Sequence, residues 1–173
     1  MSGEVGSTSP VLATNFATTA AQHLRILKQY NRIAMVGLSP NPYRPSNFVA
    51  RYMKAAGYQL FPVNPREREI LGRRCYPTVG EVPQPLEIVD IFREPAAVPE
   101  IVEQAIAAGA KVIWMQLGVI NEAAAARALT AGLEVVMDRC VKIEHARFFG
   151  GLSTLGLNAG VISARKGFTA KSD

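Results

Sequence analysis

The chain has 173 residues, of which 49% are hydrophobic and 19% charged, and its net charge is +5. This length and composition indicate a single α/β domain with enough residues to bury a core. No apolar run approaches the ~20 residues that cross a bilayer, and the first residues lack the basic and apolar regions of a signal peptide. We therefore expect a cytoplasmic protein without a membrane partner.

The cysteines and histidines are few and scattered. Cys75 and Cys140 are the only cysteines, and His23 and His145 are the only histidines. Their spacing fits no metal-ligand motif, and a disulfide is unusual in a cytoplasmic chain. We expect neither a metal site nor a structural disulfide.

Positive charge is concentrated in one part of the chain. Seven basic residues stand against two acidic residues between positions 44 and 74. A local positive field attracts anionic ligands. No nucleic-acid-binding motif and no mixing of aromatic with basic residues accompanies it, so we expect no nucleic-acid partner.

Apolar runs that end at turn residues predict five strands. They lie at residues 33–38, 59–63, 88–92, 112–117 and 134–137. Helix signals alternate with these strands: a capping box at Thr19 and Gln22, a cap at Ser46, Pro95 at a helix start, a cap at Asn121, and a helix start at 141–142. Glycines and prolines between 66 and 85 predict a loop with one short helix near 79–82.

This alternation predicts a Rossmann-like, doubly wound parallel sheet with strand order 3-2-1-4-5 in a single domain. In such a sheet, ligands bind beyond the carboxyl ends of the strands, where the strand order reverses. We expect that point between the first and fourth strands. The domain is expected to span residues 16–150, with a flexible tail over 1–15 and a C-terminal segment, 151–173, that the pattern does not place.

The segment from the first strand into the next helix is the most informative. The strand breaks at Gly37, and a proline-stiffened loop with Arg44 leads to Ser46. A helix that begins after such a turn is a common phosphate site. The G-x-G-x-x-G of dinucleotide sites is absent, because Leu38 and Ser39 follow Gly37.

The second strand ends in Asn64, Pro65 and Arg66. A dinucleotide site has an acidic residue there, which binds the ribose hydroxyls. A neutral and then a basic residue suit a phosphorylated ribose instead, and both CoA and NADP carry one. The residues at all five strand ends form the candidate site: Gly37, Leu38, Ser39, Arg44, Ser46, Asn64, Pro65, Arg66, Phe92, Arg93, Gln116, Leu117, Gly118 and Cys140.

Six ordered motifs carry a resemblance to a known family. They are Gly37-Leu-Ser, Pro62-Val-Asn-Pro65, Ile70-Leu-Gly72, Asp90-Ile-Phe-Arg93, Trp114-Met-Gln-Leu-Gly118 and Val136-Met-Asp-Arg-Cys140. Over residues 20–150 the chain resembles the small stand-alone CoA-binding proteins, which are similar to the first domain of the succinyl-CoA synthetase alpha subunit. The phosphohistidine domain of that synthetase has no counterpart in the chain, so the resemblance does not imply the ligase reaction.

The resemblance implies where coenzyme A would lie. The loop from Gly37 to Ser46 would wrap the pyrophosphate, and Arg66 would meet the ribose 3′-phosphate. The turns at Phe92-Arg93 and Gln116-Leu-Gly118 would flank the adenine and the pantetheine arm.

The residues form no catalytic triad, nucleophile elbow or metal cluster. We therefore expect a non-catalytic protein that binds CoA or an acyl-CoA. Three other interpretations stay open: an NADP-type reductase, a thiol-dependent redox protein using Cys140, and an interaction module without ligand. For the second, Arg139 and the helix start after Cys140 would favour the thiolate. A protein partner or a homo-oligomer also stays open.

Several candidate residues have a purely structural interpretation as well. Trp114 and Phe92 lie on interior strands, where aromatic side chains usually belong to the core. Arg93 and Arg139 can each pair with Asp90, Glu94 or Asp138, and His145 is expected on a helix surface.

Overall fold

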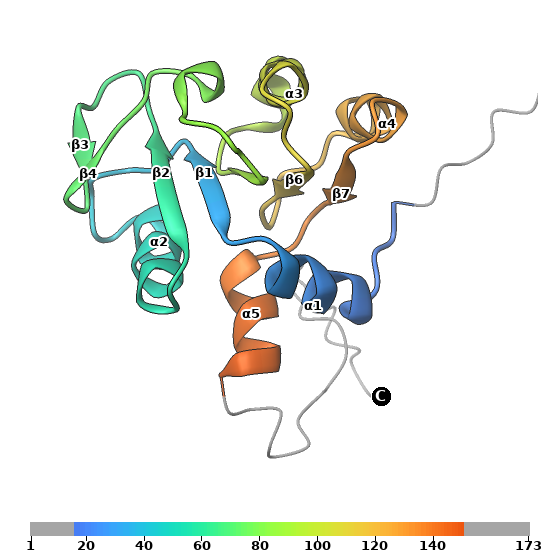
Figure 1. Ribbon diagram of the computed structural model, residues 1–173, viewed down its shortest axis with the longest axis horizontal. Coiled ribbons are helices and arrows are strands. Elements are labelled where there is room, and N and C mark those ends of the chain that lie inside the picture. Colours follow the sequence, from blue (N-terminus) through green and yellow to red (C-terminus); the bar gives the residue numbers. More distant parts are fainter. Residues whose placement is uncertain (1–15, 151–173) are drawn as a thin grey trace, which may run out of the picture.

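The computed structural model describes residues 16–150, so the expectations for 1–15 and 151–173 lie outside the described residues. Five parallel strands form the central sheet, in the order β2-β1-β5-β6-β7 (Figure 1). Their bounds are β1 Arg32–Val36, β2 Gln59–Val63, β5 Ile88–Ile91, β6 Val112–Met115 and β7 Glu134–Val136. Every residue of β5 and β6 is buried, as expected for strands covered on both faces. The predicted fold class, a doubly wound parallel sheet in one domain, is confirmed.

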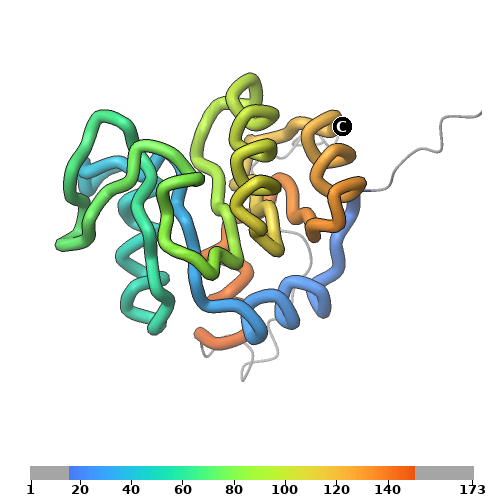
Figure 2. The backbone as a smooth tube through the Cα atoms, turned by 45° about the horizontal axis from the view of Figure 1, so that its top comes forward, coloured from blue at the N-terminus to red at the C-terminus, as the bar shows by residue number. Residues whose placement is uncertain are grey.

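Five α-helices flank the sheet: α1 Ala20–Gln29, α2 Pro45–Ala55, α3 Val98–Ala107, α4 Glu122–Thr130 and α5 Val141–Phe149. Helices α3 and α4 cover one face, and α1, α2 and α5 cover the other (Figure 1). Helices α1 and α5 pack against each other, although they come from opposite ends of the described chain (Figure 2). Two short 3₁₀ helices, η1 Val79–Glu81 and η2 Pro95–Ala97, lie on the connections into β5 and α3.

The position of the third strand corrects the sequence-based strand order. Numbered by succession, the observed order is 2-1-3-4-5, because β5 pairs with both β1 and β6. Strand β2 is therefore the edge, and its residues Gln59 and Phe61 are only partly covered. The strand order therefore reverses between β1 and β5, and not between the first and fourth strands as expected.

The connection from β2 to β5 explains this difference. It contains no α-helix, and a small antiparallel hairpin, β3 Glu69–Ile70 and β4 Arg73–Arg74, folds back beside β2. Leu71 and Gly72 form its turn, and both have positive φ, as a tight hairpin turn requires. The sequence predicted a loop here and missed the hairpin, but the short helix expected near 79–82 is present as η1.

Two of the expected helix caps are confirmed and one is wrong. The Thr19 side chain accepts a hydrogen bond from the Gln22 N–H, and the Asn121 side chain accepts one from the Ala124 N–H. Ser46 lies inside α2, which begins one residue earlier at Pro45. Its hydroxyl oxygen instead accepts the Ser39 N–H at 3.1 Å, so Ser46 holds the loop before the helix.

His145 is also not where the sequence predicted it. It is 8% exposed, and a 3.0 Å hydrogen bond joins its Nδ1 to the Tyr52 hydroxyl. Burial lowers the pKa of His145. The side chain therefore joins α5 to α2 in the interior.

Candidate functional site

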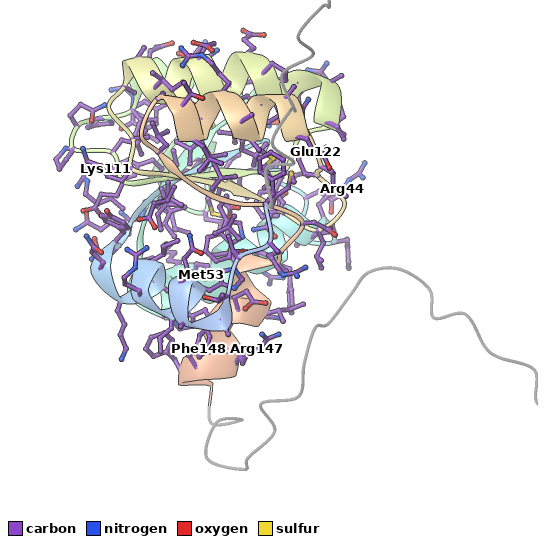
Figure 3. The ribbon with its side chains drawn as sticks, turned by 90° about the vertical axis from the view of Figure 1, so that its right-hand side faces the viewer. Arg44, Met53, Lys111, Glu122, Arg147 and Phe148 are labelled. Atoms are coloured by element: carbon purple, nitrogen blue, oxygen red, sulfur yellow. The ribbon has the colours of Figure 1, made fainter. Side chains whose placement is uncertain are left out.

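A cleft of about 980 Å³ opens at the carboxyl edge of the sheet, above the ends of β1, β2, β5 and β6. In Figure 3, Arg44 lies on this edge and Lys111, which precedes β6, lies on the opposite one. The cleft is centred where the strand order reverses, which is the usual ligand position in open parallel sheets. Eleven of the fourteen predicted residues line it: Gly37, Ser39, Arg44, Ser46, Asn64, Pro65, Arg66, Phe92, Arg93, Gln116 and Leu117.

The loop between β1 and α2 is held in shape by its own side chains. Besides the Ser39–Ser46 bond, the Asn47 Nδ2 donates to the Ser39 carbonyl at 2.8 Å, and the Asn64 Nδ2 donates to the Leu38 carbonyl at 3.0 Å. Asn64 also accepts the Arg66 N–H at 3.0 Å. The loop is therefore preorganised, and Asn64 couples it to the end of β2.

Gly37 lets β1 and β5 approach each other at the floor of the cleft. Its φ is +83°, and a Cβ at this position would lie 2.8 Å from the Cδ of Arg93 and 3.1 Å from the carbonyl oxygen of Phe92. Only glycine meets both conditions without displacing its neighbours. The single glycine of this loop is thus required by the fold as well as by the site.

Positive charge borders the cleft on the β1 and β2 sides. Arg44 and Arg66 are exposed, and within residues 16–150 neither forms an ion pair with a carboxylate. Arg93 differs, because its guanidinium lies 3.0 Å from the carboxylate of Glu94, one of the three partners considered for it. Arg44 and Arg66 are therefore the arginines whose charge is free to meet an anion.

The opposite wall of the cleft comes from residues that the sequence analysis missed. Thr78, Glu100 and Gln104 line it, together with Ile101 and Val119. The Gln104 Oε1 accepts the Val79 N–H at 3.2 Å, so it ties α3 to η1. Glu100 places a carboxylate beside an otherwise positive cleft. The only sequence signal was the spacing of Glu100 and Gln104 on one helical face.

The floor of the cleft contains a buried carboxyl group just below its surface. Gln116 follows β6, and its Nε2 donates to the Oδ1 of Asp90 at 2.7 Å. Asp90 is 0% exposed, and burial raises its pKa to about 8. At neutral pH this carboxyl group is therefore protonated.

Three predicted residues are not among those that line the cleft. Leu38 is 0% exposed and packs in the core, and the Gly118 N–H donates to the Asp138 carboxylate at 2.8 Å in the turn after β6. Cys140 is the residue before α5 and packs against the core on the α1, α2 and α5 face.

The environment of Cys140 disfavours the thiolate that the redox interpretation requires. Burial raises the pKa of its thiol and outweighs the hydrogen bonds from the backbone N–H groups of Ile143 and Lys142, which lower it. Trp114 is 0% exposed, as predicted, and its Nε1 donates to the Arg139 carbonyl at 2.8 Å. Phe92 has both expected surroundings, because it packs against the core and also borders the cleft.

No helix within residues 16–150 has the length and apolar character needed to cross a membrane. In the same part of the chain, no cluster of histidine, cysteine and carboxylate side chains is arranged to hold a metal ion.

Comparisons with known proteins agree with this geometry. The chain is 39% identical over 126 residues to the uncharacterized protein YneT of Bacillus subtilis, which covers 73% of this chain and 93% of YneT. The structure of a hypothetical protein from Pyrococcus horikoshii OT3 superimposes with a TM-score of 0.75 at 43% identity, over 83% of this chain and 98% of that one.

A more distant relative is a large enzyme. The chain is 32% identical over 72 residues to an ADP-forming acetate–CoA ligase of Archaeoglobus fulgidus, which is 42% of this chain but only 10% of the ligase. A family model described as a CoA binding domain matches residues 31–146. That match includes every strand of the central sheet and every residue that lines the cleft, and the chain belongs to the CoA-binding domain family.

Proposed function

We propose that this protein binds coenzyme A, or an acyl-CoA, in the cleft at the carboxyl edge of the sheet and catalyses no reaction on it. The observation that carries the proposal is the end of β2. There Asn64 and Pro65 stand where a dinucleotide site has an acidic residue. Arg66, which forms no ion pair with any residue of 16–150, follows in the lining of the cleft. This combination suits a ribose that carries a phosphate, and family membership favours CoA over NADP.

The ligand would lie across the reversal point between β1 and β5. Its pyrophosphate would face the loop from Gly37 to Ser46, where Arg44 and the amino end of α2 supply positive potential. The 3′-phosphate would meet Arg66. The adenine and the pantetheine arm would pass Phe92, Arg93 and the Gln116–Leu117 turn, so that all eleven predicted residues in the lining contact or shape the site.

The chemistry of the lining supports a binding role. Its polar side chains are hydroxyl, carboxamide and guanidinium groups with one carboxylate, Glu100, and no histidine or cysteine of residues 16–150 lines the cleft. Such groups position a ligand but provide no activated nucleophile beside a base. The relationship to the acetate–CoA ligase covers 10% of that enzyme and brings no ligation chemistry to this proposal.

Binding can be tested by thermal unfolding of the full chain with CoA, acetyl-CoA, dephospho-CoA, NADP and NAD. A ligand at 100 times its dissociation constant adds about 2.7 kcal/mol to the free energy of unfolding. We expect CoA and acetyl-CoA to raise the melting temperature most, and dephospho-CoA and NAD least. Stabilisation by NADP without stabilisation by CoA would contradict the proposal.

A further inference from the structure

Asp90 places a carboxyl group in the apolar core of the sheet. It lies in the central strand β5, between Met35 of β1 and Trp114 of β6, and its side chain is fully buried. No residue that the structure describes bonds its Oδ2. A buried carboxyl group with one oxygen left without a hydrogen bond destabilises a fold, because burial removes the hydration of that oxygen.

The one hydrogen bond that the Asp90 side chain makes within residues 16–150 leads to the cleft. Its Oδ1 accepts the Nε2–H of Gln116 at 2.7 Å, and Gln116 lines the cleft while being only 5% exposed. The backbone of Gln116 is also fixed: its N–H donates to the Ile91 carbonyl at 3.3 Å, and its carbonyl accepts the Val119 N–H at 2.9 Å.

This arrangement determines which atom of the Gln116 carboxamide is available. Asp90 takes one N–H of the amino group, whereas the Oε1 bonds no side chain or backbone group within residues 16–150. Because the amino group faces Asp90, the oxygen is the acceptor that Gln116 offers to an N–H or O–H donor of a ligand. Without Asp90, the carboxamide could rotate and present either end.

We propose that Asp90 is a positioning residue, which holds the Gln116 carboxamide so that its oxygen accepts a hydrogen bond from an amide N–H of the pantetheine arm. The inference rests on the proposed function and extends it, because it assigns the β6 end of the cleft to the amide-bearing part of CoA. The β2 end, with Arg66, takes the phosphorylated nucleotide. Asp90 itself touches no ligand.

The test compares CoA with adenosine 3′-phosphate 5′-diphosphate, which keeps the nucleotide but lacks the arm. In calorimetric titrations, Asp90→Val and Gln116→Met should each weaken CoA binding about threefold to tenfold, the range of one net hydrogen bond. Neither should change the affinity for the shorter ligand. The double variant should lose no more than Gln116→Met alone, because both act through one contact. Asp90→Asn keeps an acceptor oxygen and should bind CoA as the parent does.

Losses that are equal for the two ligands, or losses that add in the double variant, would overturn the proposal. A second measurement tests the arrangement without any ligand. The side-chain ¹⁵N–¹H signals of Gln116, identified by their absence in Gln116→Met, should shift as the pH is raised through about 8, the value to which burial raises the pKa of Asp90. Asp90→Asn should abolish this shift, and Cys140→Ser, which removes the nearby thiol, should keep it.

A shift that persists in Asp90→Asn would also overturn the proposal. These results separate it from the proposed function. If the parent bound neither ligand, the CoA site itself would be wrong, and the Gln116 signals would still show whether Asp90 holds that side chain.

Discussion

The two faces of the sheet are packed with different kinds of residues. Beneath α3 and α4, the buried residues are all apolar and include Val89, Ile91 and Ile113. On the face of α1, α2 and α5 lie the buried polar residues of the described chain, since Asp90 is two positions from Ile88 and Gln116 two positions from Trp114, and residues two apart share a face. They are His23, Ser46, Asn47, Asp90, Gln116, Glu144 and His145.

The two faces therefore have different roles: one mainly stabilises the fold, and the other also shapes the cleft. The apolar face gains free energy from burial alone, at about 25 cal/mol per Å². The polar face must satisfy each buried group, and those nearest the carboxyl edge, Ser46, Asn47 and Gln116, shape the cleft. Burying polar groups on this face therefore costs free energy of folding, and it does so where the site needs fixed polar groups.

The largest effect is expected from His23, whose Nδ1–H donates to the Glu144 carboxylate at 2.9 Å with both side chains buried. Burial by itself would raise the pKa of Glu144, but the hydrogen bond and charge of His23 and the charge of Arg147 lower it overall. His23→Leu should destabilise the protein by about 3 kcal/mol, the lower end for breaking a buried pair, because Arg147 still lies 3.3 Å from Glu144.

Urea unfolding at neutral pH measures this effect. The control is Arg127→Gln, which breaks the exposed Arg127–Glu103 pair beside the apolar face and should cost less than about 1 kcal/mol. Equal effects for the two variants would remove the contrast between the faces.

Asp90→Asn should have the opposite sign. The folded pKa of Asp90, about 8, lies above that of an unfolded chain, so its contribution to stability is fully present at low pH and is lost as pH rises through about 8. Asparagine has no such loss. A shift of about four pKa units corresponds to roughly 5 kcal/mol, and a buried amide N–H left without a partner offsets up to about 3 kcal/mol of it. The variant should therefore be more stable than the parent by on the order of 2 kcal/mol at pH ~8, and the gain should shrink towards pH ~5. A gain that does not depend on pH would show that Asp90 is not the group that titrates.

The smallest effect is expected at Glu100, the one carboxylate in the cleft lining. Glu100→Gln should tighten CoA binding by about two- to fivefold at low salt, because it removes the repulsion between the exposed Glu100 carboxylate and the phosphates of CoA. The gain should decrease as the salt concentration rises. Glu103→Gln, on the same helix but outside the lining, should leave the affinity unchanged, and an equal gain there would point to net charge and not to the cleft.

The sequence predicted those features that depend on local patterns. Apolar runs located the five strands, and the polar residues at their ends supplied most of the cleft, because parallel strands bring their carboxyl ends to one edge. The caps at Thr19 and Asn121 were also readable from side-chain chemistry.

The structural features that depend on packing between distant segments could not be predicted from the sequence. The position of β5 beside β1 is set by a connection without an α-helix, and its apolar pattern suits any interior position. The burial of His145 and the raised pKa of Cys140 arise from the way α5 packs on the sheet. Glu100 and Gln104 reach the cleft because α3 packs against η1 and α4. The predicted cytoplasmic location and the expected tail over residues 1–15 stay predictions.

The most direct test of the CoA site is a calorimetric comparison of CoA and dephospho-CoA on the parent protein and on Arg66→Ala. If Arg66 meets the 3′-phosphate, its removal should cost about 1.5–3 kcal/mol of affinity for CoA and almost none for dephospho-CoA. Arg68→Ala is the matched control, an exposed arginine two positions along that does not line the cleft, and it should bind both ligands as the parent does. Equal losses for the two ligands in Arg66→Ala, or no CoA binding by the parent, would contradict the account.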